Sequence, residues 1–401
     1  MLGYPFNQAK NIFKTFKNHG YECYFVGGAV RDYLLDVDIG DVDLATNATP
    51  DTMMELFERT VPIGIEHGTV LILDGDNEFE VTTYRSEGEY DDFRHPNYVE
   101  FVSDLTLDLS RRDFTINAIA MDLEGEVIDP FNGMNDLNNR LIHTVGSAEE
   151  RFSEDALRML RAVRFSSQLG FQVSNEVLTA IKENRDLLGK VAVERIQVEL
   201  TKTFNGSNVS CGLEVMEESG LYKELPIFKQ QFSLFFKLKK HINEPVNSFS
   251  VLVASLHLLD SNYSIHEWVR AYKLSNQVKK DAKALVEIFK AFRLDGITNV
   301  ILYQLGHDLM PQFVQLVNVI TGQLLDLDEL LNQYRQLPIQ SKSDLAISGH
   351  DLVKLFPNEK RGSWIGDYLS RVENLVLTEK LVNEKEVIES QVKTWKEQEN
   401  S

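Results

Sequence analysis

The spacing of hydrophobic residues divides the chain into an N-terminal α/β part and a longer helical part. Residues 5–20 carry apolar side chains at helical spacing and end at Gly20, which predicts an amphipathic helix. A short apolar strand, YECYFVGG, follows and stops at two glycines, and AVRDYLL after it has helical character. DVDLAT predicts another strand, and GTVLILDGDNEFEVTTYR predicts a strand pair that turns at Gly75-Asp76-Asn77.

The segment after these strands is polar and acidic, SEGEYDDFRHPNY, and predicts a loop. VEFV, INAIAMD and EVIDPF then predict further segments of the same sheet, and this part of the chain is expected to end near residue 142. Beyond it, apolar residues recur every three to four positions. RFSEDALRMLRAVRFSSQLG, residues 151–170, predicts one helix that stops at Gly170.

Length and composition limit the class of protein. The chain has 401 residues, of which 43% are hydrophobic, so we expect several sub-domains around separate cores. The sequence has no apolar run of about 18 residues and begins without an apolar signal segment, so neither a membrane helix nor a signal peptide is expected. Two cysteines, Cys23 and Cys211, indicate a reducing compartment, for which the cytoplasm is the simplest choice.

The formal net charge of −20 opposes binding to nucleic acid, unless basic residues are clustered. Such clusters do occur in the helical part, although each by itself is more typical of a solvated face. They are Lys237, Lys239, Lys240 and His241; Lys279, Lys280, Lys283, Lys290 and Arg293; and Lys354, Lys360 and Arg361.

Two acidic residues, Asp41 and Asp43, form the first candidate site. On a strand, a spacing of two places both carboxylates on one face. Because Mg²⁺ prefers oxygen ligands and takes few of them from the protein, two convergent carboxylates and substrate phosphates make a suitable magnesium site. For a D-x-D pair alone, a solvated acidic turn is the commoner explanation.

The residues before this pair make a phosphate site more specific. Gly27-Gly28 allows the backbone to approach a phosphate, and the helix expected near Ala29 directs its N-terminus at the same place. Arg31 lies in the first turn, where it can pair with phosphate. The whole segment, FVGGAVRDYLLDVDIGDVDLAT, resembles the signature of the polymerase-β-like nucleotidyltransferases, which include class II CCA-adding enzymes and bacterial poly(A) polymerases.

The resemblance implies a fold, a metal and site residues. The expected fold class is α+β: an N-terminal polymerase-β-like head with a mixed sheet, followed by an all-helical neck, body and tail. The expected boundaries are 1–142 for the head, 143–205 for the neck, 206–310 for the body and 311–401 for the tail. Gly28 and Arg31 are expected to contact the triphosphate, and Asp41 and Asp43 to hold Mg²⁺. Glu80, on a neighbouring strand, is a candidate third carboxylate, with a surface glutamate as the alternative.

Two further segments resemble family motifs. RRDFTIN, residues 111–117, resembles the motif that recognises ribose, which makes Arg112 and Asp113 candidates for that role; a surface salt bridge is the alternative for R-R-D alone. Glu154-Asp155-Ala156-Leu157-Arg158 resembles the family's protein template for the base. Asp155 and Arg158 would share a helix face, and Arg161 and Arg164 continue the same spacing. An ordinary helix-surface ion pair is the alternative.

The chemistry of the bases fits this template. Cytosine and adenine both present an amine donor beside a ring-nitrogen acceptor, so a carboxylate and a guanidinium can pair with either. Uracil and guanine present the opposite arrangement and would leave buried polar groups unpaired. Asp155 and Arg158 could therefore select C and A, while Arg161 and Arg164 stack on the base or hold phosphates. Glu194-Arg195-Ile196 resembles a motif that buttresses the template, and DPFNG, residues 129–133, a hinge.

These resemblances, dense over residues 22–200, predict an enzyme that adds or repairs the 3′-terminal CCA of tRNA from CTP and ATP. ISGHDLVKLFPNEKRGSWIGDYL resembles the segment that grips the tRNA elbow. The 86–98 loop favours full CCA addition, because its family counterpart is associated with the switch from CTP to ATP. Alternatives are a poly(A) polymerase, a partial CC- or A-adding enzyme, and a non-catalytic RNA-binding protein on the same scaffold. A homodimer is expected from the resemblance alone, and no membrane partner is expected.

Overall fold

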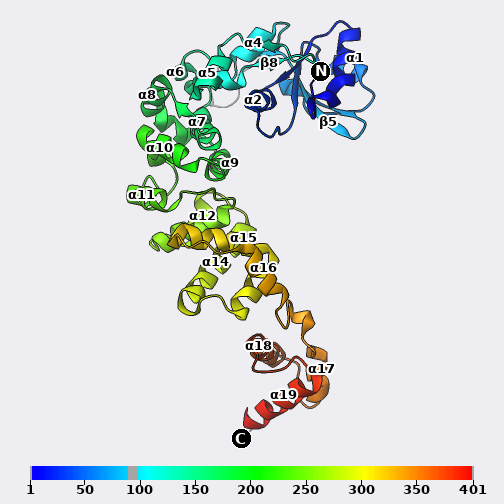
Figure 1. The fold of residues 1–401 in the computed structure, drawn as a ribbon, viewed down its shortest axis with the longest axis vertical. Coiled ribbons are helices and arrows are strands. Elements are labelled where there is room, and N and C mark those ends of the chain that lie inside the picture. The colour runs from blue at the N-terminus through cyan, green and yellow to red at the C-terminus, as the bar shows by residue number, and fades with distance from the viewer. Residues whose placement is uncertain (1, 89–97, 400–401) are drawn as a thin grey trace. The chain divides into compact units, whose positions relative to one another are not determined.

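The computed structural model describes residues 2–88 and 98–399, which form two compact units (Figure 1). The first unit contains Met1–Lys239 and Asn243–Pro245, and the second contains Lys240–Ile242 and Val246–Ser401. The first unit carries the main sheet and the helices that follow it, and the second is helical. This arrangement confirms the predicted α+β fold class, while the finer boundaries at 142, 205 and 310 stay predictions.

A mixed seven-stranded sheet forms the head, in the order β3-β4-β5-β2-β1-β8-β9. Its strands are β1 (Cys23–Val26), β2 (Asp43–Thr46), β3 (Thr60–Gly64), β4 (Thr69–Asp74), β5 (Asn77–Thr83), β8 (Ala120–Met121) and β9 (Val127–Ile128). β2 runs parallel to β5 and antiparallel to β1. The register places Asp43 between Val26 and Glu80, so Glu80 is the direct neighbour of Asp43 across the sheet.

The helices of the head include the 3₁₀ turn η1 (Phe6–Ala9), α1 (Lys10–Asn18), α2 (Gly28–Leu34), α3 (Pro50–Leu56), α4 (Leu105–Ser110) and α5 (Gly133–Asn139). Side-chain caps start two of these helices, α3 and α4. The hydroxyl of Thr49 accepts from the Thr52 N–H at the start of α3, and the carboxylate of Asp104 accepts from the Thr106 N–H at the start of α4. The helix predicted over residues 5–20 is therefore η1 followed by α1.

Two strands of the head lie outside the main sheet. β6 (Arg85–Glu87) and β7 (Val99–Phe101) pair with each other in a two-stranded sheet. The prediction that VEFV extends the main sheet is wrong, because its hydrogen bonds are made with β6. The loop predicted over residues 86–98 begins within β6, and its residues 89–97 lie outside the described part of the chain.

Among the helices after the head, α7 (Leu157–Leu169) is largely buried. The other helices of this part of the first unit are α6 (Ala148–Glu154), α8 (Asn175–Asn184), α9 (Val193–Phe204), α10 (Val209–Ser219) and α11 (Phe232–His241), and α9 and α10 both contact α7. The single helix predicted over 151–170 is wrong at one point. Asp155 has extended backbone angles, φ −139° and ψ 101°, and separates α6 from α7.

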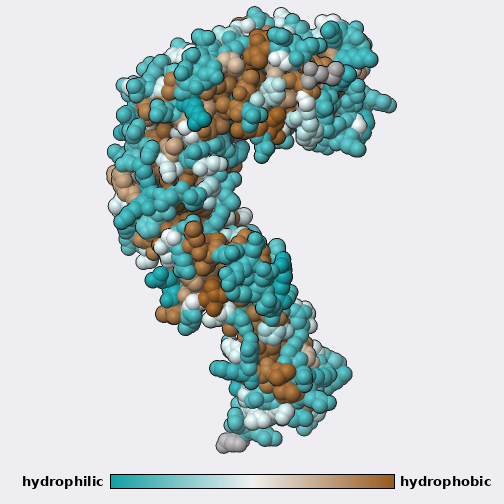
Figure 2. All heavy atoms as spheres, viewed as in Figure 1, coloured by the Kyte–Doolittle hydropathy of each residue, from teal (hydrophilic) through white to brown (hydrophobic). Residues whose placement is uncertain are grey.

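The second unit is built from α12 (Phe249–Leu259), α13 (Ile265–Ala271), α14 (Asn276–Asp295), α15 (Asn299–Thr321), α16 (Leu327–Arg335), α17 (Gly349–Leu355), α18 (Trp364–Leu377) and α19 (Lys385–Glu399). Gly306, at φ 56° and ψ −164°, interrupts α15. None of the helices described is long and apolar enough to span a membrane. Hydrophilic residues cover most of the face drawn in Figure 2, as expected for helices that bury one apolar side.

Candidate active site

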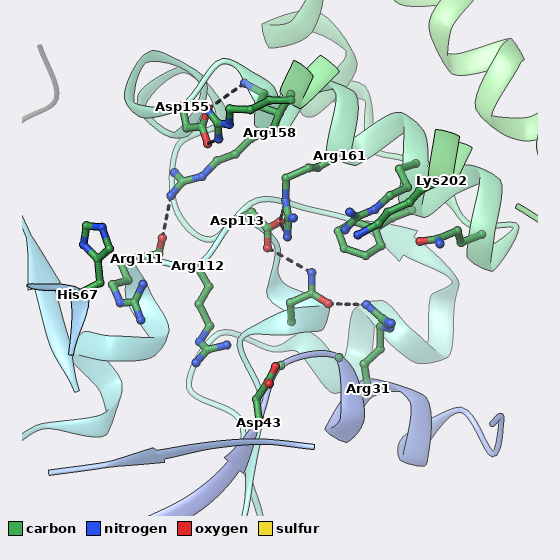
Figure 3. Close-up of a pocket in the computed structure, with 18 of the residues that line it drawn as sticks. Arg31, Asp43, His67, Arg111, Arg112, Asp113, Asp155, Arg158, Arg161 and Lys202 are labelled. Carbon is green, nitrogen blue, oxygen red and sulfur yellow. Dashed lines mark hydrogen bonds and ion pairs between the residues drawn. The ribbon is translucent and has the colours of Figure 1, made fainter. Parts of the chain in front are cut away.

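A cavity of about 770 Å³ in the first unit gathers nearly all the predicted site residues (Figure 3). Eight arginines and one lysine line it, against three aspartates, so it concentrates positive charge in a protein of net charge −20. The lining residues are Gly27, Gly28, Arg31, Asp43, His67, Arg85, Arg111, Arg112, Asp113, Asn117, Asp155, Leu157, Arg158, Arg161, Arg164, Phe165, Gln168, Arg195 and Lys202. Such a cavity suits a polyanionic ligand.

The turn between β1 and α2 requires glycine at its first position. Gly27 has φ 74° and ψ −138°, and a Cβ there would lie 3.4 Å from Nη1 of Arg112 and 3.7 Å from Oδ2 of Asp43. Arg31 is held in the first turn of α2. It donates to Asp32 at 2.9 and 2.7 Å and to Oδ1 of Asn117 at 2.8 Å. Its guanidinium is therefore fixed at the cavity wall, in a position suited to phosphate.

Asp43 is the first residue of β2 and lines the cavity. Burial in the cavity wall raises the pKa of Asp43 to about 6. The negative charges of Glu80 and Asp41 also raise this pKa, and together they outweigh the positive charge of Arg112, which lowers it. Asp41 precedes the strand and is not among the cavity-lining residues, so its role as a second metal ligand beside Asp43 stays a prediction. Asp41 still acts on Asp43 through its charge.

The carboxylates of Glu80 and Asp41 both raise the pKa of Asp43, and a divalent cation bound here would relieve this repulsion. Among residues 2–88 and 98–399, no three His, Cys, Asp or Glu side chains are arranged to hold a metal by themselves. This donor set agrees with Mg²⁺, which takes part of its ligands from phosphates and water.

Arg112 and Asp113 are fixed by partners from other segments. Asp108, with a side chain only 1% exposed, accepts from Nη2 of Arg112 at 3.1 Å. One oxygen of Asp113 accepts from Nδ2 of Asn117 at 3.2 Å, and the other accepts from Nε of Arg161 at 2.6 Å. Burial would raise the pKa of Asp113, but Arg161 and Asn117 outweigh it and lower the pKa. Asp113 is therefore ionised at neutral pH, with both oxygens available as acceptors.

Asp155 and Arg158 both line the cavity, but each is braced by other residues. Arg195 donates to both oxygens of Asp155, at 3.2 and 2.7 Å. Nη2 of Arg158 donates to the carbonyl of Arg111 at 3.0 Å, and Nη1 bonds to Glu154. A carboxylate has about four acceptor sites, so the Arg195 brace orients Asp155 and leaves it able to accept from a base.

Three guanidiniums surround the ring of Phe165, which lies on α7. The Cζ atoms of Arg164, Arg31 and Arg161 lie 4.4, 5.2 and 5.4 Å from the ring centroid. Glu199 on α9 pairs with Arg164 at 3.0 Å. Burial and then the charge of Arg161 lower the pKa of Arg164 to about 10, which shows how crowded with cations this wall is.

Every predicted site residue except Asp41 and the candidate Glu80 lines this cavity, and the structure adds residues that the sequence analysis missed. Asn117 and Phe165 line the cavity beside the arginines, while Asp108 and Glu199 contact arginines from outside the lining. Asp108 lies in α4, four residues before Arg112, which follows the end of that helix; this i, i+4 spacing could have indicated the pair. The Glu199–Arg164 pair joins two helices and has no local pattern.

Comparisons with known proteins agree with this geometry. Residues 23–143 match the poly A polymerase head domain, residues 170–232 match the RNA and SrmB-binding site of polymerase A, and residues 246–392 match the tRNA nucleotidyltransferase domain 2 family. The fold and the site together define a nucleotidyltransferase with a polymerase-β-like head.

Relatives over the whole length narrow this class. The chain is 47% identical to the CCA-adding enzyme of Oceanobacillus iheyensis, with 98% of both chains covered, and 42% identical to that of Anoxybacillus flavithermus, with 97% of this chain and 96% of the relative covered. The crystal structure of the Bacillus stearothermophilus CCA-adding enzyme in complex with CTP superposes with a TM-score of 0.88, at 35% identity and with 100% of both chains covered. The chain belongs to the bacterial CCA-adding enzyme family.

Proposed function

We propose that the protein adds and repairs the 3′-terminal CCA of tRNA, using CTP and ATP, without a nucleic-acid template. One observation carries the proposal: a single cavity joins the glycine turn and Asp43 of the head to Asp155 and Arg158 of the helices that follow. Phosphate transfer and base selection can therefore act on the same bound nucleotide.

The residues divide this task by their chemistry. Gly28 and Arg31 receive the triphosphate, and Arg112 and Asp113 hold the ribose. Asp155 accepts from the exocyclic amine of C or A, and Arg158 donates to the ring nitrogen. Arg161 and Arg164 balance the phosphate charge and support the nucleotide from the Phe165 wall.

Asp43 and Asp41, with Glu80 beside them, would hold Mg²⁺. Bound there, Mg²⁺ supplies activation of the attacking 3′-hydroxyl and charge neutralisation of the leaving pyrophosphate. The tRNA body is expected to contact the helical second unit, where α14 carries Lys279, Lys280, Lys283, Lys290 and Arg293. Such phosphate contacts would weaken with added salt.

The test is an addition assay on tRNA that lacks its 3′ end. With CTP, ATP and Mg²⁺ we expect three added nucleotides, C, C and A, followed by a stop. A long A-tail would indicate a poly(A) polymerase, and a stop after two nucleotides with both substrates present would indicate a CC-adding enzyme. tRNA binding without any addition would indicate the non-catalytic alternative, and Asp43→Ala is the matched inactive control.

A further inference from the structure

Two side chains of the cavity lining, Gln168 and Lys202, have no role in the nucleotide site proposed above. Both line the cavity, and both are exposed. In the view of Figure 3, Lys202 lies on the same side of Asp43 as Arg31, the side on which the triphosphate is proposed to bind. These two residues therefore belong to the phosphate side of the cavity.

The two residues come from helices that pack against each other, α7 and α9. Ser167 of α7 donates its hydroxyl to the carbonyl oxygen of Thr203 on α9, and both residues are buried. Gln168 follows Ser167, and Lys202 precedes Thr203. The same buried contact between the helices therefore fixes the points from which both side chains extend into the cavity.

Lys202 is a cation without a carboxylate partner in the described part of the chain. The three guanidiniums around the Phe165 ring each have one, in the pairs Arg31–Asp32, Arg161–Asp113 and Arg164–Glu199. Within residues 2–88 and 98–399, Lys202 forms no ion pair. A phosphate bound beside Lys202 therefore meets a charge that no carboxylate of these residues already offsets.

The lining residues of α7 follow the order of the parts of a nucleotide. The first turn of the helix is proposed to read the base. Arg161 then holds Asp113, proposed for the ribose, at 2.6 Å, and the ring of Phe165 contacts Arg31, proposed for the triphosphate, at 5.2 Å. Gln168 follows about 10 Å beyond Arg161, at about 1.5 Å per residue along the helix axis. Since base, ribose and phosphates are joined in this order, the group that reaches Gln168 is the terminal phosphate.

We propose that Lys202 and Gln168 bind the γ-phosphate of the incoming nucleotide, which becomes the outer phosphate of the pyrophosphate product. The proposal rests on the proposed nucleotide addition and deepens it. The Lys202 ammonium and the amide Nε2 of Gln168 donate to γ-phosphate oxygens, and the flexible lysine stem lets the ammonium follow that phosphate as pyrophosphate leaves. Because CTP and ATP share this phosphate, the subsite serves both and leaves the choice of base to Asp155 and Arg158.

The test separates the γ-phosphate from the rest of the nucleotide. Calorimetry measures Kd for CTP, CDP and CMP with wild type, with Lys202→Met, and with the control Lys182→Met, which replaces an exposed lysine of α8 outside the cavity. We expect Lys202→Met to raise Kd for CTP by about ten-fold, the size of one charge-assisted hydrogen bond, and to leave Kd for CDP and CMP unchanged. The control should bind all three nucleotides as wild type does.

Two further variants and the product check the chemistry of the contact. Lys202→Arg, which keeps the charge, should recover most of the loss. Gln168→Leu should raise Kd for CTP by about three-fold, as expected for one neutral hydrogen bond. The inhibition constant of pyrophosphate should rise in Lys202→Met by the same factor as Kd for CTP, because the product keeps the phosphate that Lys202 binds.

An unchanged Kd for CTP in Lys202→Met would identify Lys202 as a solvated surface lysine and overturn the subsite. An equal loss for CTP, CDP and CMP would also overturn it, because Lys202 would then act on another part of the nucleotide. The proposed function fails separately, if wild-type enzyme binds CTP yet adds nothing to tRNA that lacks its 3′ end. Since the Lys202 side chain is exposed, Lys202→Met should match wild type in thermal unfolding.

Discussion

Glu199→Ala should destabilise the first unit strongly, because it removes the counter-charge of a buried arginine. The Arg164–Glu199 pair is 3.0 Å long, and the two side chains are 8% and 6% exposed. Within residues 2–88 and 98–399, the hydrogen bond of the Arg164 guanidinium is made to Glu199, and its other close neighbours at the Phe165 ring are the guanidiniums of Arg31 and Arg161.

The magnitude follows from the burial of both charges. Breaking a buried pair by removing one partner costs about 3–5 kcal/mol, since the remaining charge is left uncompensated. We expect the lower end of this range, because Arg164 keeps its contact with Phe165 at 4.4 Å. The double variant Arg164→Met, Glu199→Leu should recover most of the loss, because neither charge is then buried.

The positions of the tryptophans allow the effect to be localised. All three, Trp268, Trp364 and Trp395, lie in the second unit. In urea titrations of the full chain, tryptophan fluorescence therefore reports the second unit, whereas far-UV circular dichroism reports both. Glu199→Ala should move the dichroism transition to lower urea and leave the fluorescence transition in place.

Two results would refute this reasoning. A loss below about 1 kcal/mol would mean that the pair is screened as a surface pair is. A double variant as unstable as the sum of the two single variants would mean that the charges do not interact, and that each side chain acts through packing alone.

Three further predictions concern the cavity. The raised pKa of Asp43, about 6 against 3.8, means that its ionisation destabilises the fold as pH rises through about 6. Without metal, the Asp43→Asn variant should therefore be more stable than wild type between pH 5 and pH 8, by on the order of 1 kcal/mol after discounting for solvent screening. Thermal unfolding across this pH range measures the difference, and equal pH profiles for the two proteins would contradict the prediction. Asn117→Ala should raise KM for CTP and ATP by about ten-fold, because Arg31 loses its support, while the Kd for tRNA stays constant; an unchanged KM would show that Asp32 suffices. Arg195→Gln should release Asp155 and increase UMP incorporation relative to CMP by about ten-fold in single-nucleotide assays, and unaltered selectivity would exclude the bracing role.

The predictions from sequence that held rest on local patterns. The Gly27-Gly28 turn, the neighbouring Arg31 and the RRD segment each lie within a few residues, so residue type and spacing were enough to identify residues that line one cavity. Their contacts with phosphate and ribose stay predictions. The apolar periodicity likewise predicted most helices, because one buried face imposes a repeat that can be read in the sequence.

The errors occurred where a local pattern was overridden. Residues 151–170 keep helical spacing, yet Asp155 adopts an extended conformation and pairs with Arg195, forty positions away. VEFV has the composition of a sheet strand, but its partner is β6. In both cases the pairing partner decided the outcome: for Asp155 it lies forty positions away, and for VEFV it is the preceding strand Arg85–Glu87, which the composition of VEFV alone does not reveal.

The sequence by itself determined which chemical groups this protein has. These are carboxylates suited to a metal, arginines suited to phosphate, and a carboxylate with a guanidinium suited to pairing with nucleotide bases. The tertiary structure decided how they are held. It placed Glu80 beside Asp43, and it brought Asp108, Asn117 and Glu199 into contact with arginines of the cavity. The physical reason is charge compensation: buried guanidiniums need acceptors, and folding supplies them from whichever strand or helix packs against them.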